Sequence, residues 1–174
     1  MLERGFIHLY FGEGKGKTTS AIGLSIRALG AGLKVAFLQF FKPGNSSEVK
    51  ILKNFYPHLL YAFFHFGSFV RGKNINEELV KKIHEGYAFF KEILFQKNYD
   101  LIVLDEFLYA LNWNIINLDE FLELLKNKPL EIEIVITGRE APKLLIEAAH
   151  LVTEMKMIKH YFKEGVRARW GIEK

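Results

Sequence analysis

The sequence alternates between short apolar runs and longer stretches in which apolar residues recur every three or four positions. The short runs have the length and composition of buried β-strands. They cover residues 6–11, 34–40, 59–66, 99–106, 131–137 and 151–155. Helical patterns lie between them, over residues 18–29, 48–55, 77–96, 118–126 and 143–149. This alternation predicts an α/β fold in three layers, α/β/α, with a mostly parallel sheet of about six strands and helices on both faces.

Local signals mark where three of these helices begin. Asn76 is followed by two glutamates and then by the longest helical stripe, which is typical of a helix N-cap. Asn117 and Glu120 have the spacing of a capping box. Pro142 suits the first turn of the last helix.

The first strand runs directly into a glycine-rich loop that opens the first helix. The loop consists of Gly12, Glu13, Gly14, Lys15, Gly16, Lys17, Thr18 and Thr19. A strand, a turn of this kind and a helix N-terminus direct backbone N–H groups toward one point, which suits a polyphosphate. Lys17 adds a cation, and the hydroxyl of Thr18 can coordinate Mg²⁺. The pattern predicts a phosphate-binding loop, or P-loop, for ATP or GTP.

A glycine-rich hairpin turn with two solvated lysines is the alternative. The sequence after the loop continues helically, with Ile22, Ile26 and Leu29 on one face, and this favours the phosphate site. A usual P-loop has four residues between its first glycine and the Gly-Lys pair, which puts Phe11 in the place of that glycine. The loop is therefore a variant that begins one residue late and carries an extra Lys15. We expect a P-loop fold of the RecA-like type.

Polar residues follow two later strands. Asp105 and Glu106 end the strand at 99–106, where an acid beside a P-loop can hold Mg²⁺ directly or through water. In isolation this pair would be a helix cap, but the P-loop upstream favours the metal role. Arg139 follows the strand at 131–137 and is either a phosphate ligand or an exposed turn residue.

Composition narrows the class of protein. The 174 residues are enough for one domain, and we expect residues 1–174 to form a single nucleotide-binding domain in which residues 156–174 are a C-terminal active-site tail. The apolar runs are too short to span a membrane, and the first residues lack the features of a signal peptide, so we expect a cytoplasmic protein. The absence of cysteine excludes disulfides, thiolate catalysis and cysteine-ligated zinc.

Charge and aromatic content limit the partners. The net charge of +4 is spread along the chain, with no basic stripe or recognised nucleic-acid module, so nucleic acid is not expected as a partner. Aromatic residues make up 14% of the chain, and the run at residues 61–66 exceeds what one strand face usually buries. A large flat apolar ligand or a subunit interface would explain this excess.

Taken together in order, several of these segments resemble the P-loop type of cob(I)alamin adenosyltransferase. The segments are the loop at residues 12–19, Arg27, residues 104–106, 137–139, 151–155, 159–160 and 165–173. The similarity runs from about Phe6 to the C-terminus. The P-loop and the acidic strand are common to many nucleotide-binding proteins, whereas the shortened loop and the tail are specific.

The resemblance implies transfer of the 5′-deoxyadenosyl group of ATP to the Co(I) centre of a corrinoid, which yields adenosylcobalamin or adenosylcobinamide and triphosphate. By position it implies that residues 12–19 cradle the phosphates and that Lys17, Glu106 and His160 take part in catalysis. The implied Mg²⁺ ligands are Thr18, Glu106 and Asp105. Arg27 and Arg139 are expected near ATP.

The resemblance also raises the question of which aromatic residue contacts the corrinoid. Related enzymes use a Phe and a Trp, two residues apart in a loop after the third strand, to displace the lower axial ligand of cobalt. Here Ser68 and Val70 stand at those places, with Phe69 between them. Phe69 is the candidate, with a core role as the alternative, and Phe162 in the tail is a second expected corrinoid contact.

Other functions compete with this one. A nucleoside kinase or a RecA-like ATPase shares the P-loop, but neither explains the tail. A nucleotide-dependent regulator or corrinoid carrier would leave ATP intact when Co(I) is supplied. For the transferase we expect small-molecule substrates, a flavoprotein reductant, a homodimer and no membrane partner.

Overall fold

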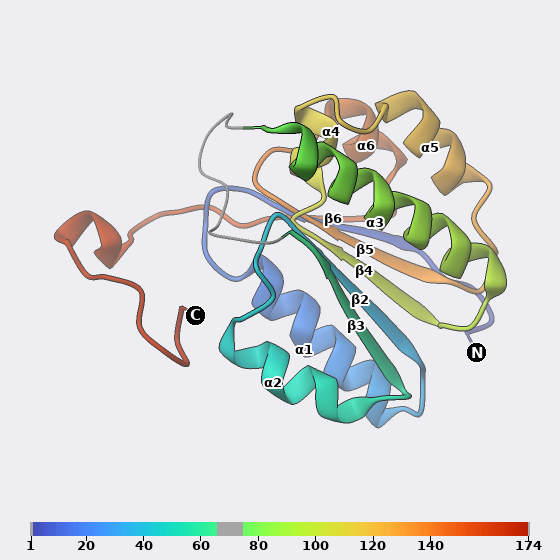
Figure 1. The fold of residues 1–174 in the computed structure, drawn as a ribbon, viewed down its shortest axis with the longest axis horizontal. Coiled ribbons are helices and arrows are strands. Elements are labelled where there is room, and N and C mark those ends of the chain that lie inside the picture. Colours follow the sequence, from blue (N-terminus) through green and yellow to red (C-terminus); the bar gives the residue numbers. More distant parts are fainter. Residues whose placement is uncertain (1, 66–74, 174) are drawn as a thin grey trace.

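The computed structural model describes residues 2–65 and 75–173 and contains a single α/β sheet assembly (Figure 1). The strands are β1 (Ile7–Phe11), β2 (Val35–Phe40), β3 (Leu59–Phe64), β4 (Leu101–Asp105), β5 (Glu133–Thr137) and β6 (Leu151–Glu154). The helices are α1 (Lys17–Gly30), α2 (Ser47–Leu52), α3 (Glu77–Gln96), α4 (Leu108–Asn112), α5 (Leu118–Lys126) and α6 (Lys143–Ala148), with short 3₁₀ turns η1 (Lys53–Phe55) and η2 (Tyr161–Glu164).

All six strands are parallel and lie in the order β3-β2-β4-β5-β1-β6. Helices α1 and α2 cover one face of the sheet, and α3, α4, α5 and α6 cover the other (Figure 1). The predicted three-layer α/β/α architecture is therefore confirmed. Because the strands are parallel, the carboxyl ends of β1, β2, β4 and β5 meet at one edge, where ligands of such sheets bind.

Side chains of successive strand residues enter two separate cores. Phe37 and Val103 pack with Ala21 of α1 on one face, whereas Leu38 and Leu104 pack with the larger helical layer on the other. This is the alternation expected for strands buried on both faces. The two cores hold the sheet rigidly and thus fix the positions of the loops at its carboxyl edge.

The predicted helix starts are confirmed for α3 and α5. The side chain of Asn76 accepts a hydrogen bond from the Leu79 amide at 2.8 Å, and that of Asn117 accepts one from the Glu120 amide at 3.0 Å. Helix α4, directly after the acidic pair, was not predicted because its five residues are too short to show a periodic pattern.

The packing face of α1 differs from the stripe suggested by its largest apolar residues. Ala21, Ser25 and Ala28 are the buried residues, while Ile26 is 41% exposed. Small side chains allow α1 to lie close to the sheet, and the Ser25 hydroxyl is satisfied by the Ala21 carbonyl at 2.8 Å. The close approach fixes the helix N-terminus relative to the strand ends.

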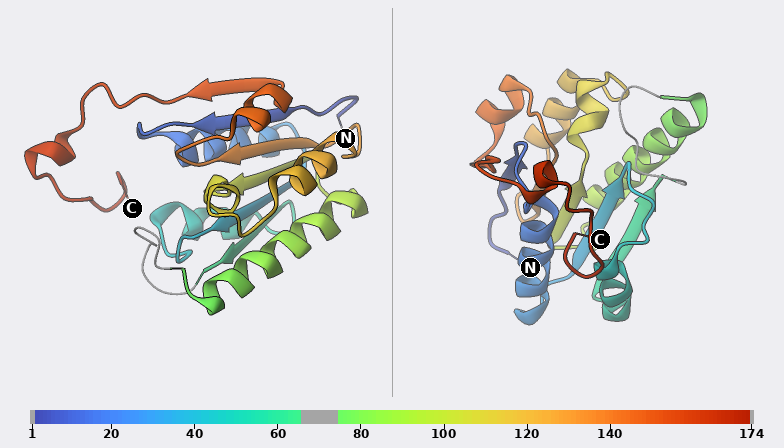
Figure 2. Two further views of the ribbon diagram at one scale, coloured as in Figure 1. Left: turned by 90° about the horizontal axis from the view of Figure 1, so that it is seen from above. Right: turned by 90° about the vertical axis from the view of Figure 1, so that its left-hand side faces the viewer.

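Strand β6 lies at one edge of the sheet, and the chain beyond it leaves the body of the fold (Figure 2). All four residues of β6 are exposed. The tail then forms η2 and returns its C-terminal residues toward the glycine-rich loop. At the other edge, β3 ends at Phe64, and the described His65, which was expected in this strand, lies outside it. Phe66, the last residue of the expected strand, lies outside the described residues. Among the described residues, no helix is both long and apolar enough to cross a membrane.

Candidate functional site

The glycine-rich loop packs closely against the chain that follows β6. The amides of Gly12 and Gly14 donate to the carbonyls of Arg139 and Met155, each at 2.7 Å. A Cβ atom on Gly12 or Gly14 would lie 2.5 or 2.6 Å from the Met155 carbonyl oxygen, which is too close for any side chain. Glycine at these two positions is therefore required by packing, and their amides are not available to phosphate.

The open amides lie at the start of α1. Gly16 has φ 119° and opens the helix, and the Ser20 amide, bonded to the Gly16 carbonyl at 2.7 Å, is the first to have a helical acceptor. Residues 17–19 thus present their N–H groups at the positive end of the helix dipole, which favours an anion. The predicted phosphate site therefore consists of residues 17–19 rather than of the whole loop at residues 12–19.

Lys17 lies over the loop. Its Nζ donates to the Gly12 carbonyl at 2.6 Å and to the Gly14 carbonyl at 2.7 Å. Burial lowers the pKa of this ammonium, and the nearby Glu106 carboxylate opposes that shift. Within the described part of the chain, the hydrogen-bond partners of Lys17 are neutral carbonyls. Such a cation gains a stronger, charge-assisted bond when a phosphate arrives.

Asp105 is the fully buried centre of a polar cluster at the end of β4. One carboxylate oxygen accepts from the hydroxyls of Thr18 at 2.8 Å and Thr137 at 2.7 Å. The other accepts from Gln39 Nε2 and Lys42 Nζ, each at 2.9 Å. Burial would raise the pKa of this carboxyl, but the Lys42 charge and the hydrogen bonds outweigh it and hold the pKa below its ordinary value.

Lys42 was missed by the sequence reasoning. Its Nζ lies 2.7 Å from Thr18 Oγ1, 2.9 Å from Asp105 Oδ2 and 3.2 Å from Glu106 Oε1. The two carboxylates raise its pKa above the ordinary lysine value despite burial. The available signal was its position two residues after the strand at 34–40, at the edge where the other site residues gather.

Two strained backbone positions direct these side chains. Phe41 after β2 and Glu106 after β4 have φ of 57° and 61°, in the left-handed region that non-glycine residues rarely adopt. Phe41 is buried against the rings of Tyr109 and Trp113 at 5.8 and 5.3 Å. The Glu106 amide donates to Thr137 Oγ1 at 2.9 Å. Packing and hydrogen bonds therefore hold both turns in place.

A cavity of about 860 Å³ opens over the loop. Residues named from the sequence that line it are Glu13, Gly14, Lys15, Lys17, Glu106, Arg139, His160 and Phe162. Met157, Lys163 and Glu173 also line it and belong to the tail at residues 156–174 that the sequence placed at the active site, although none was singled out for a role. The lining residues that the sequence reasoning missed are Tyr109 and Trp113. Tyr109 and Trp113 follow the acidic pair and are four positions apart, which is the spacing of two side chains on one face of a helix. This spacing was a signal that could have indicated an aromatic side of the site.

The C-terminal tail is anchored on the loop through Lys15. The Lys15 ammonium donates to Glu173 Oε1 at 3.1 Å and to the Ile172 carbonyl at 3.0 Å. Glu173 also accepts from Tyr161 and from Arg169, whose bonds hold its pKa well below the ordinary value. The extra lysine of the variant loop thus contacts the tail in this structure rather than pointing over the phosphate site.

His160 and Phe162 are brought to the cavity by the tail. The His160 Nδ1 accepts from the Phe162 amide at 3.1 Å and thereby caps η2. Phe162 is 67% exposed. One ring nitrogen of His160 is used locally, so only Nε2 is open to a ligand.

The two arginines named from the sequence lie in different places. Arg139 is exposed at the cavity and pairs with Glu13 at 3.0 Å. Arg27 lies in the last turn of α1, ten positions after Lys17, which is roughly 15 Å along the helix axis. The structure does not bring Arg27 to the loop. Phe69 lies outside the described residues.

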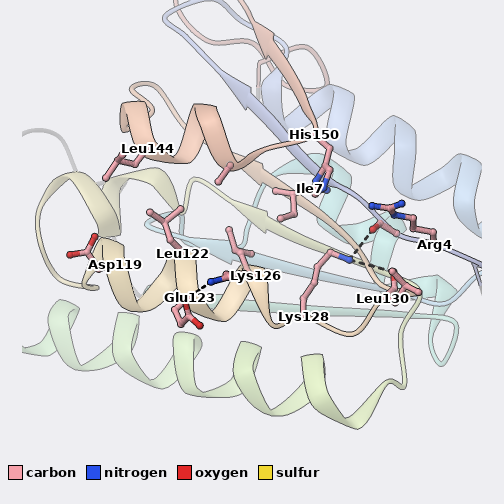
Figure 3. A pocket seen from close by; sticks show the side chains of 13 residues that line it. Arg4, Ile7, Asp119, Leu122, Glu123, Lys126, Lys128, Leu130, Leu144 and His150 are labelled. Atoms are coloured by element: carbon pink, nitrogen blue, oxygen red, sulfur yellow. Dashed lines mark hydrogen bonds and ion pairs between the residues drawn. The ribbon is translucent and has the colours of Figure 1, made fainter.

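A second cavity of about 600 Å³ lies at the amino ends of the strands, between α5 and α6 (Figure 3). Lys128 at this cavity donates to the carbonyls of Gly5 and Ile132, both at 2.8 Å. Its pKa is lowered by burial. The Lys128 ammonium already donates to backbone carbonyls, and the P-loop lies at the other, carboxyl ends of the strands. This cavity is therefore not the nucleotide site.

The parallel sheet, the glycine-rich loop at the start of α1 and the acid at the end of β4 define a P-loop nucleotide-binding protein. Within that class, residues 3–173 match the model of the family described as ATP:corrinoid adenosyltransferase BtuR/CobO/CobP. The chain belongs to this family. The activity class predicted from the sequence, an ATP-using corrinoid adenosyltransferase, is therefore supported, and the kinase, ATPase and carrier alternatives are not.

Named relatives agree with this assignment. The corrinoid adenosyltransferase of Pseudomonas aeruginosa is 36% identical over 172 residues, which cover 98% of this chain and 84% of the relative. That of Escherichia coli K12 is 33% identical over 172 residues, covering 98% and 86%.

Similar solved structures support the fold alone. The flagellar accessory protein FlaH from Methanocaldococcus jannaschii superposes with a TM-score of 0.55 and 18% identity, over 88% of this chain and 72% of that protein. The RadB recombinase gives a TM-score of 0.50 and 14% identity, over 90% and 77%. At such identities the function of these proteins does not transfer.

Proposed function

We propose that the 860 Å³ cavity binds ATP with its triphosphate at the start of α1 and presents C5′ to a Co(I) corrinoid on the side of the tail. The observation that carries this proposal is that an anion site and a cluster of oxygen atoms, here called the oxygen cage, lie together at the carboxyl ends of the strands. Residues 17–19 supply the open amides, and Thr18, Asp105 and Glu106 supply the oxygens.

The reaction requires positioning more than acid–base chemistry. Co(I) of the substrate donates an electron pair to C5′, a cobalt–carbon bond forms, and the C5′–O bond breaks with its electrons leaving on triphosphate. Co(I) is already a strong nucleophile, so the protein's contribution is to align C5′ and to stabilise the leaving charge. Lys17 and the open amides are placed for that second task.

The oxygen cage fits Mg²⁺. Thr18 Oγ1, Asp105 Oδ2 and Glu106 Oε1 all lie around one ammonium, Lys42 Nζ, and hard oxygen ligands are those that Mg²⁺ prefers. We assign Mg²⁺ to these three residues. Bound there, the metal would neutralise part of the triphosphate charge.

The tail supplies the corrinoid side of the cavity in this proposal. His160 and Phe162 line the cavity together with the aromatic residues Tyr109 and Trp113. Phe162 offers an exposed ring to a flat macrocycle, which supports its predicted corrinoid contact. Phe69 stays a proposed contact on the lower face of the corrin, and Arg139 a proposed ATP ligand.

Exposed apolar side chains support a homodimer. Leu151 and Val152 of the edge strand β6 are 41% and 40% exposed, and Ile158 in the tail is 90% exposed. Apolar surface beside an unpaired strand edge favours association with a second copy.

We also propose a flavoprotein as the electron donor for cobalt and the cytoplasm, where ATP is available, as the location.

Glu106→Gln provides a direct test of the site. Purified protein with ATP, Mg²⁺ and chemically reduced corrinoid should form a cobalt–carbon bond, followed by its absorption spectrum, and release triphosphate. The variant should need more Mg²⁺ for the same rate, whereas Glu120→Gln on α5 should behave as the parent. An unchanged Mg²⁺ requirement in Glu106→Gln would remove Glu106 from the metal site, and intact ATP in the parent protein would contradict the reaction.

A further inference from the structure

The ammonium of Lys42 occupies the place at which the oxygen cage would hold a divalent cation. An ammonium has three N–H donors. Its neighbours within hydrogen-bond distance are Thr18 Oγ1 at 2.7 Å, Asp105 Oδ2 at 2.9 Å and Glu106 Oε1 at 3.2 Å. All three acceptors are residues that the sequence assigned to the metal. The Lys42 ammonium thus takes the place of a bound cation among these three oxygens.

Asp105 has no spare acceptor position while Lys42 is bound. Its two oxygens accept from Thr18, Thr137, Gln39 and Lys42, which fills the roughly four lone-pair sites of a carboxylate. A metal ion that binds Asp105 must therefore displace one of these donors. Thr137 and Gln39 are themselves held, because Thr137 accepts from the Glu106 amide and Gln39 accepts from the Tyr61 hydroxyl.

Lys42 is the donor that can leave. Its side chain is 21% exposed, whereas Thr137 and Gln39 are buried. Mg²⁺ binds oxygen at about 2.0–2.1 Å, so an ion at the centre of this cage would come far closer to the ammonium than two cations tolerate. The backbone of Phe41 is held in the left-handed region by packing of its ring, so the backbone from which the Lys42 side chain extends is fixed.

We propose that Lys42 is a resident cation of the metal position: it keeps Thr18, Asp105 and Glu106 arranged when nucleotide is absent, and divalent metal enters only together with nucleotide, by displacing it. This inference rests on the proposed metal site and adds an order to its occupation. Nucleotide supplies the missing part of the free energy, because triphosphate brings negative charge that both the metal and the released ammonium can bind. Lys42 is accordingly a positioning residue that also determines when metal binds.

Binding of Mn²⁺, followed by the loss of its free-ion electron paramagnetic resonance signal, tests the order without turnover. Because ATP itself chelates Mn²⁺ and so also removes the free-ion signal, ATP is titrated with Mn²⁺ in the absence of protein and that binding is subtracted. After this subtraction the parent protein should bind Mn²⁺ at least tenfold more tightly with ATP present than without it. Lys42→Met, which removes the charge but keeps much of the stem, should bind Mn²⁺ without ATP at least tenfold more tightly than the parent. Lys42→Arg keeps a cation and should resemble the parent, and the matched control Lys143→Met alters only an exposed lysine of α6.

Two results would overturn the proposal. One is parent protein that binds Mn²⁺ equally well with and without ATP, a measurement that needs no variant and so holds even where Lys42→Met fails to fold. The other is folded Lys42→Met, checked by circular dichroism, with no gain in nucleotide-free Mn²⁺ binding. Neither measurement uses corrinoid, so a failure here is distinguishable from a failure to form the cobalt–carbon bond.

Discussion

The hydroxyl of Thr18 donates to Oδ1 of Asp105 at 2.8 Å, joining the first turn of α1 to the end of β4 across 87 positions of sequence. The bond links the phosphate site to the oxygen cage directly. Movement of Thr18 toward a metal ion would therefore change its hydrogen bond to Asp105. Asp105 Oδ2 accepts from Lys42, so the change would extend to Lys42. The site behaves as one hydrogen-bonded unit rather than as separate phosphate and metal sites.

Lys17→Ala should weaken ATP binding because it removes the ammonium that lies over the loop. A charge-assisted hydrogen bond contributes about 1.5–3 kcal/mol, or about ten- to hundredfold in Kd. Isothermal titration calorimetry with ATP and Mg²⁺ measures this directly, and Lys143→Ala serves as a control at an exposed site. An affinity within about twofold of the parent would take Lys17 out of the site.

Gly14→Ala should destabilise the protein, whereas Gly23→Ala should not. A Cβ on Gly14 meets the Met155 carbonyl oxygen at 2.6 Å, so backbone must move, at a cost of about 1–3 kcal/mol. A Cβ on Gly23 meets nothing within 4 Å and replaces glycine inside a helix, a gain of up to about 1 kcal/mol. Urea unfolding of both variants measures these free energies. Equal stability of the two would show that the loop does not pack against residue 155.

Glu173→Gln should release the tail from the loop. The variant loses the ionic bonds to Lys15 and Arg169, so trypsin should cleave the tail faster than in the parent. Glu164→Gln is the matched control, since Glu164 pairs with Lys159 at 3.7 Å within the same tail and does not contact the loop. Equal cleavage rates in parent and Glu173→Gln would contradict the anchor.

The anchor should also depend on pH. Arg169 and Tyr161 hold the pKa of Glu173 below its ordinary value, so the carboxylate stabilises the closed tail fully above the ordinary Glu pKa of about 4.3. That contribution is lost as the pH falls from there through the lower pKa of the closed state. Amide resonances of residues 161–173 should accordingly stay constant above about pH 5 in the parent and shift as the pH falls below about 4. In Glu173→Gln, in which the tail is released from the loop, these resonances should not change with pH over this range. Resonances of the parent that do not shift at low pH would contradict the anchor.

Most of the fold was predictable because strands buried on both faces and amphipathic helices have distinct periodicities. The site was only partly predictable, because hydrogen-bond partners are set by the fold rather than by local sequence. Lys42 meets partners 24 and 63 positions away, and Lys15 meets one 158 positions away. Arg27 is different: it lies ten helical positions after Lys17, so its distance from the loop could have been worked out from the sequence alone.

The proposed reaction occurs at C5′ of ATP and not at phosphorus. ATP carrying oxygen-18 in the bridge between C5′ and the α-phosphorus distinguishes the two, with Mg²⁺ and chemically reduced corrinoid supplied. We predict that a cobalt–carbon bond forms in step with inorganic triphosphate that retains the label, as measured by mass spectrometry. Formation of ADP and orthophosphate, or ATP left intact in the presence of Co(I), would contradict it.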